Sequence, residues 1–279
     1  MRTPPLNSRD SAGVPPPGAG LRRTRTLGVP VDACDSLETA LGIIEARLGG
    51  GGRERAFLVT FVNPAAVAAV ERDARLGAAL RRFDMVLPDG IAMALATRRL
   101  SGLRAARISF DTTSLALPVL RLAADRGCRV ALVGGRPGVA RRAAEQLGRR
   151  FPELRIAGTW QGHRDIAALA AELRDAAPDV VVCGMGSGRQ EELLLRLAAA
   201  GWSGAGFTCG GYLDQLAGGL AYYPAWIDRA QLRWLYRLFR EPRRLWRRYL
   251  VDYGRFALRL GGALAGRLLP VPARREAGR

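Results

Sequence analysis

The chain has 279 residues, 48% of them hydrophobic, so it is long and apolar enough to bury a substantial core, and global disorder is excluded. The net charge is +18 and every basic side chain is an arginine, a balance that favours a polyanionic partner such as nucleic acid, anionic lipid or a phosphorylated substrate. Because no run of about 18 apolar residues occurs, neither a bilayer-spanning helix nor a secretory signal is expected.

The cysteines and the single histidine make zinc and triad chemistry unexpected. The four cysteines lie far apart with no Cys-x-x-Cys pair, so a structural zinc site is not predicted and a reduced, cytoplasmic setting fits best. A Ser-His-Asp or Cys-His mechanism could use only His163 as its base. The surrounding segment is typical of a loop, which favours an ordinary surface or packing role for this side chain.

Proline, glycine and arginine dominate residues 1–25, which are expected to form a disordered, flexible tail. The core is expected over residues 26–228 and begins with a helix over 36–48. Short apolar runs then alternate with stretches of helical periodicity. The apolar runs predict strands over 56–61, 84–87, 129–133, 155–158, 179–184 and 205–209. The periodic stretches predict helices over 64–83, 91–99, 112–126, 139–150, 165–176 and 189–200.

This alternation predicts an α/β fold: a Rossmann-like, mostly parallel sheet covered by helices on both faces. In such a sheet, ligands bind beyond the carboxyl ends of the strands. The polar and glycine-rich segments of this chain follow its expected strands, and they would therefore converge on one rim. They are Asn63, Asp89 and the loops 134–138, 184–190 and 210–214.

Residues 229–270 have a different character, because arginines interleave there with leucines and aromatic residues and no strand pattern occurs. Pro242 divides this segment into two expected helices. The segment is therefore predicted to be a basic, amphipathic, helical appendage that associates with a membrane, followed by a flexible tail over 271–279.

Two glycine-rich loops are candidates for binding a phosphorylated ligand. The loop 134–138 could cradle a phosphate at a helix N-terminus, but a plain tight turn explains it about as well. The segment 184–191 is the stronger candidate for a nucleotide head group, because its glycines let the backbone approach a ligand closely and Gln190 adds a donor and an acceptor. It contains neither a Walker loop nor the dinucleotide fingerprint, which argues against a dehydrogenase.

Asp89 stands directly after an expected strand. A carboxylate on a constrained turn at this edge is well placed to act as a general base, and capping the helix that begins near Ile91 is an equally good interpretation. Arg107 could bind a diphosphate with two hydrogen bonds or pair with Asp111. No Asp-x-Asp pair occurs, so no magnesium site is expected, and arginines and backbone amides would meet the charge of a leaving group.

Seven blocks occur in a fixed order between about residues 57 and 249. They are Thr60-Phe61-Val62-Asn63-Pro64, Leu87-Pro88-Asp89-Gly90, Arg107 to Asp111, Gly134-Gly135-x-Pro137-Gly138, Gly184-x-Gly186-x-x-x-Gln190-Glu191, Gly210-Gly211-x-x-Asp214, and Trp234-x-x-Arg237 through Glu241-Pro242-x-Arg244. Together they resemble the bacterial WecG/TagA/CpsF glycosyltransferases, glycosyltransferase family 26. The resemblance implies inverting transfer of a hexose or N-acetylhexosamine from a UDP-sugar to a polyprenyl-diphosphate-linked saccharide during synthesis of cell-surface polysaccharide. It implies no metal and no cofactor beyond the donor itself.

The resemblance also implies roles for individual residues. Asp89 would be the catalytic base, with Thr60 and Asn63 lining the pocket beside it, and Glu191 would lie at the nucleotide. The candidate substrate-binding residues are Thr60, Asn63, Arg107, Asp111, Gly134, Gly135, Gly186, Gln190, Glu191 and Asp214. The appendage would contact the membrane and bring arginines over the site, for which the candidates are Arg237, Arg244, Arg247 and Arg248.

The implied partners are the UDP-sugar, the polyprenyl-diphosphate-linked acceptor and the anionic inner leaflet, so a cytoplasmic protein peripheral to the inner face of the cell membrane is expected. The sequence leaves open whether it forms a homo-oligomer. Gly188-Arg189 stands where the family often has Pro-Lys, and Tyr222-Tyr223-Pro224 where many members have Arg-Ala-Pro, so the donor sugar stays open. A nucleic-acid-binding protein is the alternative that the positive charge favours, but lipid contact explains the aromatic residues of the appendage equally well and no nucleic acid is expected.

Overall fold

The computed structural model describes residues 20–49, 54–219, 227, 233–240 and 246–268. Its centre is a six-stranded sheet with the strand order β4-β3-β8-β7-β5-β6, in which every neighbouring pair is parallel. The α/β fold with a parallel sheet is therefore confirmed. The strands are β3 (Phe57–Val62), β4 (Met85–Pro88), β5 (Arg129–Gly134), β6 (Arg155–Trp160), β7 (Val180–Gly184) and β8 (Ala205–Thr208).

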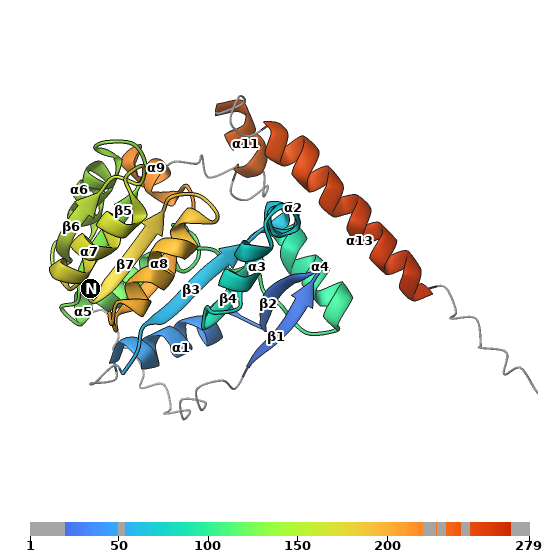
Figure 1. Cartoon of the computed structure of the whole chain (residues 1–279), viewed down its shortest axis with the longest axis horizontal. Helices are drawn as coiled ribbons and strands as arrows, with labels where there is room; N and C mark the ends of the chain where they lie inside the picture. The colour runs from blue at the N-terminus through green and yellow to red at the C-terminus, as the bar shows by residue number, and fades with distance from the viewer. Residues whose placement is uncertain (1–19, 50–53, 220–226, 228–232, 241–245, 269–279) are drawn as a thin grey trace, which may run out of the picture.

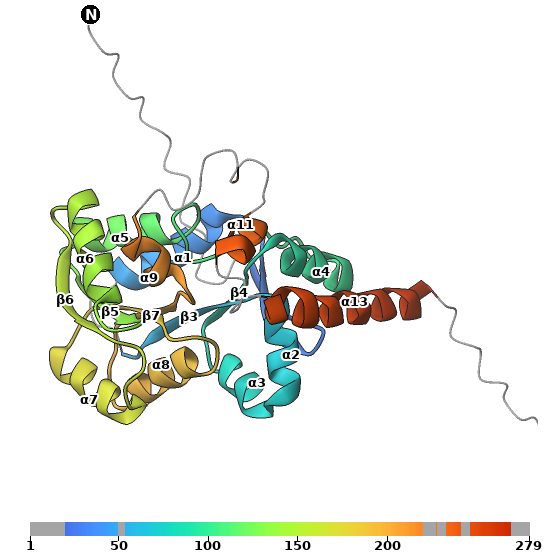
Figure 2. The same ribbon diagram turned by 90° about the horizontal axis from the view of Figure 1, so that it is seen from above.

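Helices cover both faces of this sheet, and Figure 2 shows them on opposite sides of the strands. One hydrophobic cluster joins the sheet to α1 (Leu37–Gly49), α5 (Ala116–Asp125), α6 (Val139–Arg150) and α9 (Tyr212–Ala217). A second cluster joins the other face to α2 (Pro64–Arg72), α3 (Ala74–Leu80), α7 (Ile166–Ala176) and α8 (Arg189–Ala199). β7 is buried at every position because helices cover both of its faces, and this is why its sequence is a continuous apolar run.

The expected tail over residues 1–25 is wrong for its last part. Residues 21–25 belong to β1 (Leu21–Thr26), which pairs antiparallel with β2 (Val29–Cys34), while residues 1–19 lie outside the described residues. The two strands are joined by Leu27 and Gly28, both with positive φ, a two-residue turn of the kind that matches the twist of a hairpin. Three exposed arginines in β1 conceal the strand pattern, because exposed residues occur on both of its faces and the sequence does not alternate between apolar and polar residues.

The single helix expected over 64–83 is two helices, α2 and α3, broken at Asp73. This residue has extended backbone angles (φ −141°, ψ 101°), and its carboxylate accepts a hydrogen bond of 2.9 Å from the Arg75 amide. An aspartate gains this interaction at a helix start and not within a helix, so it ends one helix and caps the next.

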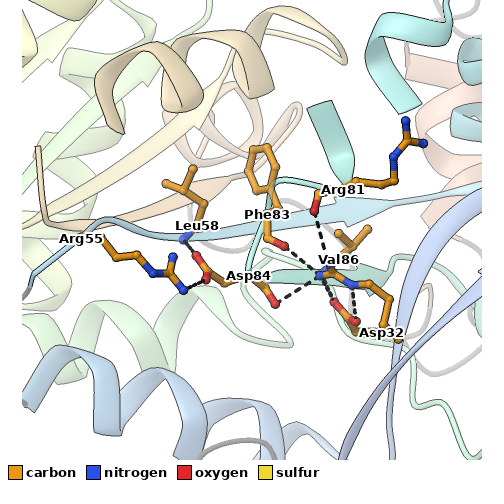
Figure 3. Close-up of polar contacts among 8 residues, drawn as sticks. Asp32, Arg55, Leu58, Arg81, Phe83, Asp84 and Val86 are labelled. Carbon is orange, nitrogen blue, oxygen red and sulfur yellow. Dashed lines mark hydrogen bonds and ion pairs between the residues drawn. The ribbon is translucent and has the colours of Figure 1, made fainter. Parts of the chain in front are cut away.

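The hairpin is fixed to the edge of the sheet by the carboxylate of Asp32, as Figure 3 shows. Asp32 is 2% exposed and accepts hydrogen bonds from the Val86 amide of β4 at 2.7 Å and from both Nε and Nη2 of Arg23 at 2.8 and 2.7 Å. Arg23 in turn donates to the Phe83 carbonyl at 2.8 Å. A charged pair thus supplies the partners that a neighbouring strand would otherwise give to β4.

Asp84, directly before β4, connects this strand to β3 in a similar way (Figure 3). One of its carboxylate oxygens accepts from the Leu58 amide of β3 at 2.8 Å, and the other accepts from Arg55 at 2.6 Å. Asp32 and Asp84 therefore fix the amino-terminal ends of β3 and β4. The loops at the opposite, carboxyl ends of these strands take no part in this attachment.

The C-terminal appendage contains α11 (Arg233–Arg240), a π-helical turn η1 (Arg248–Asp252) and α13 (Tyr253–Leu268). Figures 1 and 2 show α13 extending away from the α/β core. Ion pairs of Arg72 with Asp252 of η1, at 3.1 Å, and of Glu71 with Arg259 of α13 hold the appendage to α2. Arg267, near the end of α13, donates to the Arg99 and Leu100 carbonyls of α4 (Ile91–Ser101). Helices were expected here; Pro242, expected to separate them, lies outside the described residues. Among the described residues, no helix is long and apolar enough to cross a bilayer.

We expect Asp32→Ala to lower the free energy of unfolding by about 2–3 kcal/mol, because the Val86 amide would lose its acceptor inside the protein and a buried unpaired donor costs about 1–3 kcal/mol. Urea unfolding at neutral pH measures the change. Asp175→Ala is the control: it removes an exposed ion pair with Arg174 and should cost less than about 1 kcal/mol. Equal losses in the two variants would contradict the role given to Asp32.

Candidate functional site

A cavity of about 1440 Å³ opens at the carboxyl edge of the sheet. Its wall contains Asn63 after β3, Asp89 after β4, Gly135 after β5, Gly186 after β7 and Gly210 after β8. The expectation that these strand-end segments converge on one rim is therefore confirmed. Residues of the candidate set that line the cavity are Asn63, Asp89, Arg107, Asp111, Gly135, Gly186, Gln190, Glu191 and Asp214.

The floor of this cavity is built where three strand ends come together without side chains. A Cβ atom on Gly134 would lie 2.3 Å from the Gly184 carbonyl oxygen, and one on Gly184 would lie 2.6 Å from the Gly210 carbonyl oxygen. No real Cβ tolerates such distances, so the ends of β5, β7 and β8 meet backbone against backbone. Gly134 is thus buried beneath the cavity, where it fixes the packing of the loops, and its neighbour Gly135 reaches the wall.

The 184–191 loop is fixed at its end by Glu191. Gly186 and Gly188 both have positive φ, of 85° and 92°, which lets the loop turn tightly before α8 begins. The Glu191 carboxylate then reaches back and accepts a hydrogen bond of 2.6 Å from the Gly188 amide. This places a negative charge at the N-terminus of α8, where the helix dipole favours it.

Glu191 is also the centre of a buried polar network. Glu191 is 2% exposed, and its Oε1 accepts from the side-chain Nε2 of Gln190 at 2.9 Å and from the Thr60 hydroxyl at 3.2 Å. The Oε1 of Gln190 accepts from the Gly210 amide at 3.2 Å, so the network ties the ends of β3, β7 and β8 together. Burial raises the pKa of Glu191 above its usual range, against the opposing effect of these hydrogen bonds.

Thr60 does not lie where it was expected. It is fully buried, its hydroxyl is shared between Glu191 and Thr208 at 2.8 Å, and it is not among the residues that line the cavity. The structure therefore places Thr60 beneath the wall, as a support for Glu191. Sequence reasoning placed Thr60 on the wall because it could not show that the side chain of Glu191, on α8, packs against this part of β3.

Asp89 lies half-buried on the cavity wall, immediately after β4. Its backbone amide donates to the Val62 carbonyl at 2.8 Å, so the turn is tied to the end of the neighbouring strand. The alternative that Asp89 caps the following helix is wrong, because the N-cap of α4 (Ile91–Ser101) is Gly90, which has a φ of 87°. The turn between β4 and α4 thus places Asp89 on the cavity wall.

Asn63 and Arg107 line the same cavity as Asp89. Asn63 caps α2, where its Oδ1 accepts from the Ala65 amide at 3.1 Å. Arg107 donates to Asp111 at 2.8 Å and to the Ser109 hydroxyl at 3.0 Å, which shows the expected pairing with Asp111, and its binding of a diphosphate stays a prediction. The guanidinium is half-buried and held in one orientation beside the cavity.

Several wall residues were not found by sequence reasoning. His163, set aside as a loop residue, lies on the wall together with Arg136. The appendage also closes one side of the cavity, with Leu238, Tyr249, Leu250, Asp252 and Tyr253. Two of these gave a signal: tyrosines four residues apart lie on one face of a helix, and the rings of Tyr249 and Tyr253 pack edge to face at 5.0 Å.

The arginines expected over the site are not placed there by the described residues. Arg247 is exposed and is not among the residues that line the cavity. Arg244 lies outside the described residues, as do the side chains of Arg237 and Arg248. Within the part of the chain that the structure describes, no three His, Cys, Asp or Glu side chains cluster in a way that could hold a metal ion.

We expect the stability of Glu191→Gln to depend on pH differently from that of the wild type. Because the folded protein holds the Glu191 proton more tightly than the unfolded chain, the wild type should lose stability relative to the variant as pH rises above the ordinary pKa of about 4.5. Urea unfolding of both proteins between pH 4.5 and 8 gives this difference. A difference that stays constant or moves in favour of the wild type would contradict the raised pKa.

Comparison with known proteins places this site in a family. Residues 24–268 match the profile of the glycosyl transferase WecG/TagA/CpsF family. The chain is 27% identical over 207 residues to the UDP-Gal:alpha-D-GlcNAc-diphosphoundecaprenol beta-1,4-galactosyltransferase of Shigella boydii, which covers 72% of this chain and 84% of that protein.

Two further relatives share one description, N-acetylglucosaminyldiphosphoundecaprenol N-acetyl-beta-D-mannosaminyltransferase. The protein of Bacillus subtilis (strain 168) is 27% identical over 195 residues, covering 69% of this chain and 75% of the relative. That of Bacillus spizizenii is 29% identical over 197 residues, covering 70% and 75%. Since the family profile matches most of the chain, the protein belongs to the WecG/TagA/CpsF family and is a glycosyltransferase.

Proposed function

We propose that the protein transfers a hexose or N-acetylhexosamine from a UDP-sugar, with inversion, to a saccharide linked to polyprenyl diphosphate, in the synthesis of a cell-surface polysaccharide. The observation that carries this proposal is the shared cavity: Asp89 and the 184–191 loop line one space at the carboxyl edge of the sheet. A general base and a glycine-rich loop suited to phosphate are the two parts that such a transfer needs.

The relatives support the acceptor more strongly than the donor. The galactosyltransferase and the two mannosaminyltransferases carry different sugars in their names, but all three names contain N-acetylglucosamine linked to diphosphoundecaprenol. An acceptor of this class is therefore the proposal for this chain, and the donor is a UDP-sugar whose hexose is to be found by assay. None of these findings favours nucleic-acid binding, and that alternative is not proposed.

The proposed mechanism is a single displacement. The carboxylate of Asp89 takes the proton of the acceptor hydroxyl as this oxygen forms a bond to the anomeric carbon of the donor. The bond between that carbon and the diphosphate oxygen breaks, and UDP leaves with the electron pair. The guanidinium of Arg107 and the backbone amides of the 184–191 loop would stabilise the negative charge of the diphosphate, without a metal ion.

We expect Asp89→Asn to lower kcat by about 10² to 10⁴-fold, because an amide cannot accept the proton and general-base assistance is worth this much. UDP release from a panel of UDP-sugars, with a lipid-linked N-acetylglucosamine acceptor, measures the rate. Calorimetric titration with UDP should give nearly the wild-type affinity, since the carboxylate acts on the acceptor. A variant with near-normal kcat would remove Asp89 from the mechanism.

The appendage supports a peripheral attachment to an anionic membrane surface. Arg247 and Arg255 are exposed, and the large apolar side chains of Trp246 and Leu258 in the same segment are 50% and 79% exposed. Arginines near an anionic leaflet contribute roughly 1 kcal/mol each to binding, and apolar side chains add to this when they enter the interface.

Removing residues 229–279 should therefore abolish co-flotation with vesicles that contain anionic lipid and should lower transfer to a lipid-linked acceptor. Vesicles of zwitterionic lipid are the control and should bind the full chain more weakly. If the shortened chain still floats with anionic vesicles, the attachment does not lie in the appendage. If binding is equally strong to zwitterionic vesicles, the arginines do not provide it.

A further inference from the structure

The large apolar side chains that the described residues leave exposed are gathered in one region. All of them lie on α4 or on the appendage, and none lies on the helices that cover the rest of the sheet. They are Ile91, Leu95, Phe239, Trp246, Leu250, Val251 and Leu258. Exposed apolar side chains gathered in this way mark a binding surface more often than chance exposure does.

Part of this region belongs to the cavity itself. Ile91 and Leu95 are one helical turn apart on α4, so they share a face, and both line the cavity. They are 53% and 44% exposed, and Leu250 of η1, which lines the same cavity, is 68% exposed. Asp89 stands only two residues before Ile91, so the apolar wall begins next to the proposed base.

The apolar wall continues beyond the cavity along α13. Leu250 lines both the cavity and a shallow groove on the appendage. The groove is lined by Val251, Ala257 and Leu258 and by three glycines, Gly254, Gly261 and Gly262, at which an added Cβ would meet nothing within 4 Å. A continuous apolar path therefore runs from Asp89, past α4 and η1, onto the outer surface of α13.

We propose that this path holds the hydrocarbon chain of the lipid-linked acceptor, which leaves the cavity between α4 and η1 and lies along the groove of α13. The proposal rests on the proposed function. A polyprenyl chain has no hydrogen-bonding group, so an apolar surface beside the polar cavity is the surface that suits it. Arg255 lines the groove and is exposed, so a positive charge stands beside the apolar surface, as suits an anionic diphosphate or headgroup.

The acceptor's own chain fits this path better than a bilayer lipid does. One space is polar at the strand ends, with Asp89 and Asp111, and apolar at α4 and η1. A ligand with a saccharide diphosphate at one end and a hydrocarbon chain at the other has the same division. The exposed residues Phe239 and Trp246, by contrast, line neither the cavity nor the groove and suit contact with the bilayer.

The test compares two acceptors that carry the same sugar diphosphate, one on a long polyprenyl chain and one on a short alkyl chain, in the same detergent micelles. The full-length wild type should prefer the long-chain acceptor, judged by the ratio of the two kcat/KM values. Leu95→Gln and Leu250→Gln should lower this preference about tenfold each, because each places an amide in the hydrocarbon path. Phe239→Gln is the matched control: it makes a similar change at a side chain that is 78% exposed but lies off the path, and the preference should persist.

The outcomes separate the path from the function on which it rests. Transfer to both acceptors with an unchanged preference in Leu95→Gln and Leu250→Gln would overturn the path and leave the proposed function standing. An equal loss of preference in Phe239→Gln would assign the effect to general contact of the appendage with the micelle, and it too would overturn the path. A wild type that transfers sugar to neither acceptor would refute the proposed function and the path together.

Photo-labelling gives a measurement that does not depend on turnover. A prenyl diphosphate with a photoreactive group at the end of its chain should label peptides of α4, η1 or α13 in the full-length wild type, and an excess of unlabelled prenyl diphosphate should compete. Labelling confined to α6 or α9, on the other side of the sheet, would contradict the path.

Discussion

The close approach of β5, β7 and β8 at their carboxyl ends is the constraint on which the site depends. Gly134, Gly184 and Gly210 touch through their backbones, and any side chain on Gly134 or Gly184 would force the strand ends apart. The Gly135 amide also donates to the Gly184 carbonyl at 3.3 Å, so the contact continues past the strands into the loops. The loops that form the cavity floor are therefore held by the sheet and need not be ordered by a ligand.

The same contact explains how a carboxylate can be buried at Glu191. Its hydrogen-bond donors are neutral groups from two segments, β3 and the 184–191 loop, and a charge held only by such donors is stabilised less than one paired with a cation. Burial would be unfavourable if those segments could move apart, since each lost donor would leave the carboxylate less solvated. Rigid strand ends and a buried acid thus support each other, and the 184–191 loop takes its shape from both.

The parts of the fold and the site that could be predicted from the sequence are those that depend on patterns of neighbouring residues. The strands, their order of appearance and the rim of Asn63, Asp89 and the glycine loops follow from apolar runs and turn residues, which are local patterns. The hairpin was missed because β1 reads Leu-Arg-Arg-Thr-Arg-Thr, and only its pairing with β2 and the contact of Arg23 with Asp32 make it a strand. Thr60 was misplaced for the same reason: its partner, Glu191, lies 131 residues away along the chain.

The division of the cavity into a polar and an apolar part has a physical consequence for any ligand that joins the two. The polar part is built at strand ends that pack backbone against backbone, whereas the apolar part is shared between α4 of the core and η1 of the appendage. The appendage is attached to the core by Phe256 of α13, which is buried in the second hydrophobic cluster, and by polar contacts such as Arg72 of α2 with Asp252, which contribute little stability by themselves. A ligand that spans both parts would therefore add to the attachment of the appendage while its reacting end stays fixed by the sheet. This arrangement suits a soluble donor bound by the rigid loops and an amphiphilic acceptor bound across the junction.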